Sequence, residues 1–251
     1  MDNNSASFGR LSVVMPVYNE EKSILKIIEQ VLARPEVGEL IAVNDGSTDK
    51  SYEVLLTLKD NPKIKILNQE KNKGKGAAII RGFAEATKDF VIIQDADFEY
   101  NPEDYAKVLA PLIADKADVV YGSRFMATPG IVRFFAHEMG NKVLTFCSNF
   151  FSDIHLSDME TCYKCFKREV IQNLILTSNR FGIEVELTAK LAKFREIRIW
   201  EEPISYNPRG YCDGKKITWR DGVAAFWHIL NFNVFTSKEA SIKKAWKDVL
   251  K

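Results

Sequence analysis

Short apolar runs alternate with amphipathic helical stretches through the first half of the chain. The runs that predict buried strands are residues 11–17, 40–43, 64–67, 90–93 and 118–124. Between them, apolar residues recur at helical spacing, as at Ile24, Ile28 and Val31. Strands that alternate with helices in this way predict an α/β fold, Rossmann-like, with a mainly parallel central sheet flanked by helices.

The regular alternation stops after Arg124. A helix that is apolar nearly all round is predicted over residues 132–151, followed by a strand at 161–166 and a helix that starts near Gly182. At the end of the chain, Ile242, Trp246 and Val249 share one helical stripe and most lysines lie off it. We therefore expect a polar tail (1–10), one domain (11–235) and a C-terminal amphipathic helix (236–251).

Composition narrows the classes of function. The 35 basic and 34 acidic residues leave a net charge of +1, which gives no reason to expect a nucleic-acid partner. No apolar run approaches the ~20 residues of a membrane span, and residues 1–10 lack the apolar core of a signal peptide. Cys162-x-x-Cys165 could indicate a zinc or redox site, but its alternation with Tyr163 and Lys164 favours a strand.

Two carboxylates, Asp95 and Asp97, follow directly after the apolar run at residues 90–93. Open α/β sheets bind ligands at the carboxyl ends of their strands, and Mg²⁺ or Mn²⁺ prefers one or two carboxylates together with phosphate oxygens. The pair therefore predicts a divalent metal site. The alternative is a turn or a solvated loop, since Asp-x-Asp alone is a weak motif.

The other strand ends would bring further polar residues to the same edge. Asp45 could accept hydrogen bonds from a nucleoside, or it could cap the helix that follows it. Gly74-Lys75-Gly76 resembles a phosphate cradle at a helix N-terminus, although it lacks the full spacing of a P-loop. Arg209 and Lys215 could neutralise a leaving diphosphate, or belong to a solvated loop.

Five motifs together resemble one known family. They are Val13-Val-Met-Pro-Val-Tyr-Asn-Glu-Glu21, Val43-Asn-Asp-Gly-Ser-Thr-Asp49, Asn72-Lys-Gly-Lys-Gly-Ala77, Gln94-Asp-Ala-Asp97 and Val120-Tyr-Gly-Ser-Arg124. In this order the chain resembles family 2 glycosyltransferases of the GT-A fold, and in particular the dolichyl-phosphate and polyprenyl-phosphate sugar synthases. Later segments, including Asp158-Met-Glu-Thr-Cys-Tyr-Lys164, extend the resemblance over roughly residues 11–230.

The resemblance implies roles for these residues. The nucleotide sugar would contact Pro16, Tyr18, Glu20, Asp45, Gly74, Lys75, Asp95, Arg209 and Lys215. Asp95 and Asp97 would hold Mg²⁺ or Mn²⁺, and Asp97 would also be a catalytic residue. Arg124 would face the acceptor, and Asp158 and Glu160 would lie near the sugar. Asn207-Pro-Arg-Gly210 departs from the Gly-Arg-Thr common in related chains, which puts the role of Arg209 in question.

The implied reaction transfers a hexose, with inversion, from a UDP- or GDP-sugar to a polyprenyl-phosphate-type lipid. A hydroxyl acceptor is the alternative, and it would need a general base, for which Asp158 or Glu160 is the candidate. A sugar nucleotidyltransferase and a non-catalytic nucleotide-sugar binder are more remote alternatives. We expect a cytoplasmic protein that is peripheral at the inner face of the cell membrane, and the sequence leaves its oligomeric state open.

Overall fold

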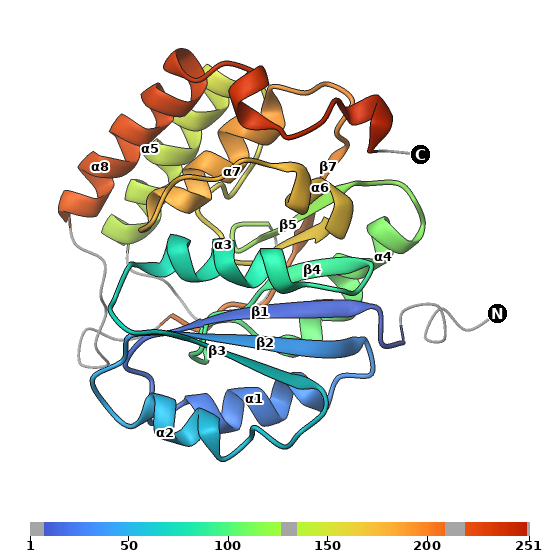
Figure 1. The fold of residues 1–251 in the computed structure, drawn as a ribbon. Helices are drawn as coiled ribbons and strands as arrows, with labels where there is room; N and C mark the ends of the chain where they lie inside the picture. The colour runs from blue at the N-terminus through green and yellow to red at the C-terminus, as the bar shows by residue number, and fades with distance from the viewer. Residues whose placement is uncertain (1–7, 127–134, 209–218, 250–251) are drawn as a thin grey trace.

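The computed structural model describes residues 8–126, 135–208 and 219–249, and one seven-stranded sheet organises them (Figure 1). Its strand order is β3-β2-β1-β4-β6-β5-β7. The strands are β1 (Leu11–Val17), β2 (Val37–Asp45), β3 (Ile64–Gln69), β4 (Phe90–Ile93), β5 (Val119–Ser123), β6 (Lys164–Lys167) and β7 (Ile199–Pro203). Only β6 pairs antiparallel, with β4 and β5. The predicted α/β fold with a mainly parallel sheet is confirmed.

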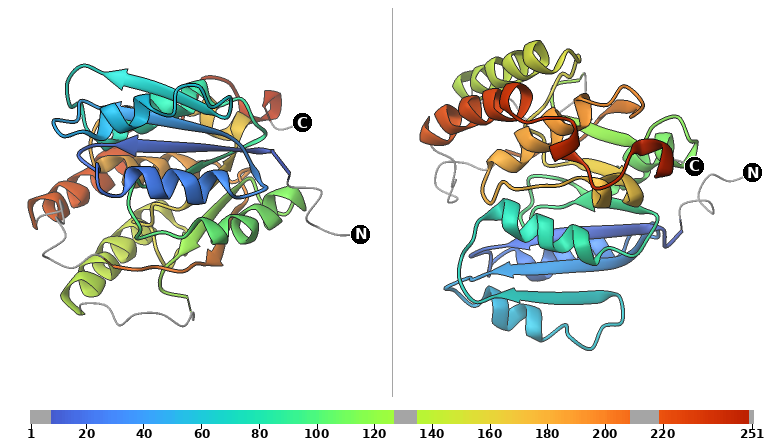
Figure 2. Two further views of the ribbon diagram at one scale, coloured as in Figure 1. Left: turned by 90° about the horizontal axis from the view of Figure 1, so that it is seen from below. Right: turned by 45° about the horizontal axis from the view of Figure 1, so that its top comes forward.

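Helices cover both faces of the β1–β3 half of the sheet. Figures 1 and 2 show α1 (Ile24–Leu32) and α2 (Ser51–Leu56) on one face and α3 (Lys75–Glu85) on the other. The predicted apolar stripe of α1 is buried against the sheet, as Ile24, Ile28 and Val31 show. Each helix thus buries one apolar side on the sheet, which is the packing that the alternating pattern predicts.

The other half of the sheet carries a larger helical layer. Its short helices, α4 (Tyr105–Ile113) and α6 (Arg168–Asn173), pack near β5 and β6. Above them, α5 (Phe135–Ser152), α7 (Gly182–Ala192) and α8 (Trp219–Leu230) pack on one another at the top of Figure 1. Every residue of α7 is buried, because α7 lies between the sheet and the two outer helices. A small second core joins these helices through Met159, Val185, Ala225 and Ile229.

The predicted amphipathic helix over residues 236–251 is wrong for the part that the structure describes. This segment makes two isolated 3-10 turns, Glu239–Ser241 and Trp246–Asp248. Its apolar stripe faces the domain, since Trp246 is buried with its ring 5.5 Å from that of Phe194. Its backbone also forms hydrogen bonds with the rest of the domain; for example, Lys243 N donates to Asn173 O at 2.9 Å. The segment is a strap on the domain surface, and its apolar spacing reflects core packing.

Parallel pairing brings the carboxyl ends of four strands to one edge. Val17 of β1 lies beside Asn44 of β2, and β4 and β5 run in the same direction. The last residues of these strands and the loops that follow them contain the predicted site residues at positions 16–20, 45, 95–97 and 124. The sheet topology therefore collects residues that lie far apart in sequence, as the strand-end argument predicts.

Candidate active site

The first two strand-end loops hold each other in place. Asn19 has a left-handed backbone (φ 54°), which asparagine tolerates better than most residues. Its backbone N–H donates to Ser47 Oγ at 3.2 Å, and Thr48 N donates back to Asn19 Oδ1 at 2.8 Å. Glu20 N donates to Ser51 Oγ at 2.7 Å. The segment that contains Pro16, Tyr18 and Glu20 is therefore fixed by polar contacts before any ligand binds.

Asp45 organises the loop in front of α3. Its Oδ1 accepts from Lys73 N at 2.8 Å and from Gln69 Nε2 at 3.1 Å, and its Oδ2 accepts from Gly74 N at 2.8 Å. The carboxylate is buried, and the N-terminus of α2 uses Asp49 instead, whose Oδ1 accepts from Ser51 N. The helix-capping alternative for Asp45 is thus wrong. A contact from Asp45 to a nucleoside remains a prediction.

Gly74 and Gly76 allow a close approach between α3 and a distant loop. A Cβ atom on Gly74, whose φ is 101°, would lie 2.4 Å from Asn179 O, and one on Gly76 would lie 2.1 Å from Ser178 O. The first turn of α3 also donates from Ala77 N to Asn179 O at 3.0 Å. A protein carbonyl therefore occupies one backbone donor of the suggested phosphate cradle, and a contact from Gly74 or Lys75 to a nucleotide stays a prediction.

A charged network connects α3 to Asp95. Lys75 Nζ lies 2.8 Å from Asp95 Oδ1 and 3.6 Å from Glu184 Oε1, while Lys164 Nζ lies 2.7 Å from Glu184 Oε2. Burial lowers the pKa of Lys75, but the charge of Asp95 opposes this and leaves the pKa well above its usual value. A full positive charge therefore sits beside Asp95. Asp97 accepts from Glu99 N at 3.0 Å in its own turn.

The donor set at this position fits a hard divalent cation. Asp95 and Asp97 offer carboxylate oxygens, and the ammonium of Lys75 already shows that a cation fits against Asp95. Across the described ranges, no cluster of three or more acidic, histidine or cysteine side chains is arranged to hold a metal. A metal bound by this pair would take its other ligands from substrate oxygens and water, as Mg²⁺ commonly does.

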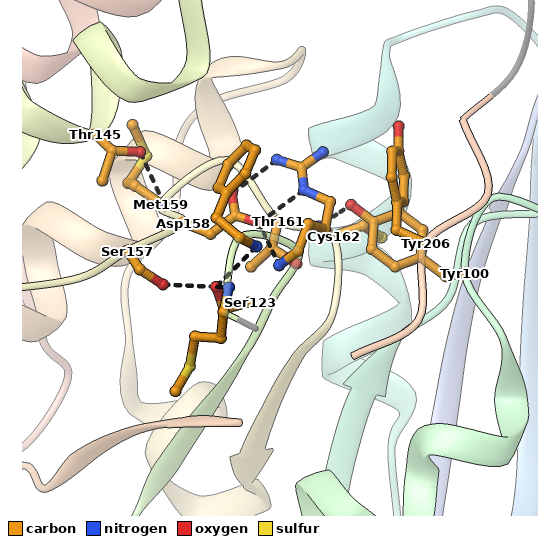
Figure 3. A network of polar contacts seen from close by, with 12 residues as sticks. Tyr100, Ser123, Thr145, Ser157, Asp158, Met159, Thr161, Cys162 and Tyr206 are labelled. Carbon is orange, nitrogen blue, oxygen red and sulfur yellow. Dashed lines mark hydrogen bonds and ion pairs between the residues drawn. The ribbon is translucent and has the colours of Figure 1, made fainter. Parts of the chain in front are cut away.

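Asp158 lies in a network of polar contacts, close to Tyr206 in the view of Figure 3. An ion pair joins Asp158 to Arg124 inside the protein. Its Oδ2 accepts from Arg124 N at 2.9 Å and from Arg124 Nε at 2.7 Å, and its Oδ1 accepts from Arg124 Nη2 at 2.8 Å. Asp158 is fully buried, and the guanidinium lies over the ring of Tyr206 at 5.2 Å. This geometry favours a positioning role for Asp158 and argues against its use as a general base.

Glu160 has the environment that a general base requires. Its Oε1 is enclosed and accepts no hydrogen bond from the described residues. Burial, and then the nearby charge of Glu184, raise the pKa of Glu160 to about 7. Glu160 can therefore gain or lose a proton near neutral pH. Arg209 and Lys215 lie outside the described residues, so their predicted roles stay predictions.

The family is decided by comparison with known proteins. The model of "Glycosyl transferase family 2" matches residues 12–175, which is more than half of the chain and includes the four strand-end loops. The chain belongs to glycosyl transferase family 2. The resemblance inferred from the motifs is confirmed, and this family 2 domain has the GT-A fold that the resemblance implied.

Relatives of this family 2 chain include two archaeal enzymes. It is 32% identical over 205 residues to the "Low-salt glycan biosynthesis hexosyltransferase Agl6" of Haloferax volcanii, covering 79% of this chain but only 48% of that protein. The chain thus spans about half the length of that relative. It is 27% identical over 237 residues to the "UDP-N-acetylglucosamine--dolichyl-phosphate N-acetylglucosaminyltransferase" of Methanococcus voltae, covering 87% and 94% of the two chains.

A solved structure supports the fold of the family 2 domain. Glucosyl-3-phosphoglycerate synthase from Mycobacterium tuberculosis, in complex with Mn²⁺, UDP and phosphoglyceric acid, superimposes with a TM-score of 0.71. The match covers 93% of this chain and 82% of that one at 17% sequence identity, so it establishes the fold.

Sequence reasoning missed several residues of this site. The rings of Tyr206 and Tyr100 meet edge to face beside Arg124, with ring centroids 5.4 Å apart. Glu201 of β7 accepts from Ser157 N at 2.9 Å and from Asp158 N at 3.3 Å, so it holds the Asp158 loop. None of these residues lies in one of the five motifs, and only the folded chain brings them together.

Proposed function

We propose that this family 2 protein transfers a hexose from a UDP- or GDP-sugar to a polyprenyl-phosphate-type lipid, with inversion and with a divalent cation. The observation that carries the proposal is the juxtaposition of two unlike surfaces. The strand-end edge joins Asp45, Lys75 and Asp95 through polar contacts. Beyond Arg124 and Asp158, α5 presents a stripe of exposed apolar side chains.

On the donor side, the proposal assigns the nucleotide sugar to the edge formed by residues 16–20, 45, 74–75 and 95–97. Asp95 and Asp97 would hold Mg²⁺ or Mn²⁺. When bound, the cation would neutralise charge on the departing nucleoside diphosphate. Solved relatives of the same fold contain Mn²⁺ or Mg²⁺ together with UDP, which supports this assignment.

On the acceptor side, a phosphate monoester needs little activation. Its second pKa is about 6, so its oxygen is largely ionised at neutral pH. That oxygen would form a bond to the anomeric carbon while the bond from this carbon to the diphosphate breaks. Arg124 would lie on the acceptor side, with Asp158 holding its guanidinium in a fixed orientation. The dolichyl-phosphate relative from Methanococcus voltae supports a lipid phosphate as acceptor.

The exposed stripe of α5 supports a lipid substrate. Its members follow one another at intervals of three or four residues and so share one side of the helix: Phe135, Met139, Val143, Phe146 and Phe150. Phe146 and Phe150 are 70% and 72% exposed. Trp227 of the neighbouring α8 is also largely exposed. Large apolar side chains in such a cluster are typical of surfaces that contact membranes or partners.

A hollow of about 520 Å³ lies between this stripe and the loop of residues 155–157 that leads to Asp158. Phe146, Phe150, His155 and Ser157 help to line it. Ser157 directly precedes Asp158, and its hydroxyl lies 2.6 Å from that of Ser123, next to Arg124. We propose that the protein contacts the inner face of the cell membrane peripherally through this region. Among the described residues, no helix is long and apolar enough to cross a bilayer.

A hydroxyl acceptor is the second candidate, and Glu160 is the observation that favours it. A hydroxyl oxygen must lose its proton during transfer, and a carboxylate with a pKa near 7 suits that role. The acceptor could then belong to a polysaccharide or glycolipid.

The test compares the two acceptors directly. Purified protein is incubated with Mn²⁺, a panel of UDP- and GDP-sugars, and either undecaprenyl phosphate or undecaprenol. Glycosylated undecaprenyl phosphate and free nucleoside diphosphate are expected, and EDTA should suppress both. Product from undecaprenol alone would support the hydroxyl acceptor, and no turnover with any donor would contradict the proposed function.

A further inference from the structure

We propose that Lys75 is the resident counter-ion of Asp95, and that its ammonium moves to Glu184 when a divalent cation binds. This inference rests on the proposed function, because it assumes that the cation binds at Asp95 and Asp97. It adds a role for two residues: Lys75 competes with the cation, and Glu184 accepts the displaced charge.

The first position of Lys75 is the ion pair with Asp95. Its Nζ lies 2.8 Å from Asp95 Oδ1, and the two side chains are 18% and 21% exposed. At this exposure water screens the pair only partly, so a cation that takes Asp95 must compete with a bound ammonium. The backbone of Lys75 cannot easily move, since Gly74 N donates to Asp45 and Ala77 N donates to Asn179 O. Any rearrangement therefore falls to the flexible lysine side chain.

The second position is Oε1 of Glu184. It lies 3.6 Å from Lys75 Nζ and is buried, yet it accepts no hydrogen bond within the described part of the chain. The other oxygen, Oε2, is bound by Lys164 at 2.7 Å, and Lys164 in turn donates to Thr161 O. Glu184 is consequently held in place with one oxygen facing Lys75. A buried carboxylate oxygen without a donor is costly, so an ammonium that reaches hydrogen-bond distance gains stability there.

The arrangement keeps the charges balanced during the exchange. Without metal, Lys75 neutralises Asp95. With metal, the divalent cation neutralises Asp95, and the ammonium of Lys75 moves a short distance to an oxygen that lacks a donor. The protein alone should therefore bind a cation weakly, and binding should strengthen when a diphosphate supplies further oxygen ligands.

Manganese binding tests this proposal without using activity. Free Mn²⁺ is measured by electron paramagnetic resonance in titrations of the wild type, Lys75→Met, Glu184→Gln and the double variant, each with and without UDP. Lys65→Met is the matched control, because this variant also loses a lysine ion pair. Lys65 pairs with Glu85 at the C-terminal end of α3, away from Lys75 at its start. Asp97→Asn reports whether the Mn²⁺ is at the proposed site.

Three results are expected. Lys75→Met should bind Mn²⁺ roughly five- to tenfold more tightly than the wild type without UDP, which is the scale of a partly buried ion pair. Glu184→Gln should weaken binding by about threefold or more when Lys75 is present, and this loss should shrink in the Lys75→Met background. A crystal structure with Mn²⁺ and UDP should show Lys75 Nζ hydrogen-bonded to Glu184 and away from Asp95.

Other results would overturn the proposal in distinguishable ways. If Lys75→Met binds Mn²⁺ as the wild type does or more weakly, while Asp97→Asn still loses binding, the metal site stands. Lys75 then does not compete with the cation. If Glu184→Gln weakens Mn²⁺ binding equally in the Lys75→Met background, Glu184 attracts the cation directly. If no variant binds Mn²⁺ even with UDP, or if Asp97→Asn binds normally, the metal site of the proposed function fails as well.

Discussion

The two halves of the molecule use their polar residues differently. In the half built from β1–β4 and α1–α3, called the donor half after the proposed function, side-chain oxygens at the strand ends accept from backbone N–H groups of neighbouring loops, as Asn19 does from Thr48 and Asp45 from Gly74. In the half built from β5–β7, α5, α7 and α8, called the acceptor half after the same proposal, carboxylates are buried against cations, as Asp158 is against Arg124 and Glu186 against Lys190. The donor half is therefore a set of mutually braced loops, whereas the acceptor half is held by buried ion pairs.

The halves differ equally in their apolar residues. The strands and helices of the donor half place most large apolar side chains in the core, whereas α5 leaves Phe135, Phe146 and Phe150 exposed. The family 2 model covers residues 12–175, which include the donor half and also α5, but not α7 or α8. We infer that the donor half provides a preformed nucleotide site, and that the acceptor half carries the features that adapt this chain to its own acceptor.

The largest effect is expected at Asp97 in the donor half, where activity should be lost while thermal stability is kept. Asp97→Ala should lower kcat/KM by about 10³-fold or more, because the metal would lose one of its two protein ligands. The thermal unfolding midpoint should stay close to that of the wild type, since Asp97 supports a surface turn. Product formation and calorimetry measure the two quantities, and Glu103→Ala is a control for loss of a nearby exposed acid. Normal turnover in Asp97→Ala would remove this residue from the metal site.

The next effect concerns stability in the acceptor half. Trp246→Ala should lower the free energy of unfolding by about 3 kcal/mol, because it empties a buried position against Phe194. Denaturant unfolding measures this change, with Lys247→Ala as the control on the same turn. A Trp246→Ala variant of normal stability would show that this position does not contribute to the core.

A smaller effect, and one that depends on pH, is expected at Glu160 near the junction of the halves. Its pKa is about 7 in the folded protein and near 4.5 when unfolded, so the folded state holds the proton more tightly. The stability that this provides is complete below pH 4.5 and is lost as the pH rises to about 7. Glu160→Gln stays neutral and should avoid this loss.

The measurement compares the free energies of unfolding of Glu160→Gln and the wild type at pH 4.5 and pH 8. Relative to the wild type, the free energy of unfolding of Glu160→Gln should be about 1–3 kcal/mol higher at pH 8 than it is at pH 4.5. A difference that does not vary with pH would mean that the carboxyl of Glu160 titrates normally.

The smallest effect tests the exposed stripe. The double variant Phe146→Ser and Phe150→Ser should bind anionic liposomes about fivefold more weakly, because two partly inserted rings are lost. Its stability should hardly change, since both rings are mostly exposed. Cosedimentation measures binding, with the equally exposed Phe8→Ser as the control. Equal binding of the variant and wild type would show that α5 does not face the membrane.

Local pattern was enough to predict the framework of this protein. Strand and helix periodicity depends on neighbouring residues, so the strands at residues 11–17 and 90–93 and the buried stripe of α1 could be identified from the sequence. The position of Asp95 and Asp97 after a central strand followed from the same pattern. The ordered motifs then indicated the family, which the comparison confirmed.

The tertiary structure decided what the polar and amphipathic residues do. Lys75 meets Glu184 and Asp45 meets Gly74 only because the chain folds back on itself, and no local spacing encodes those pairs. The same holds for the burial of Asp158 and for the strap that contains Trp246. An apolar stripe or a charged side chain specifies that a partner is needed, whereas the partner itself is selected by the packing of segments far apart in sequence.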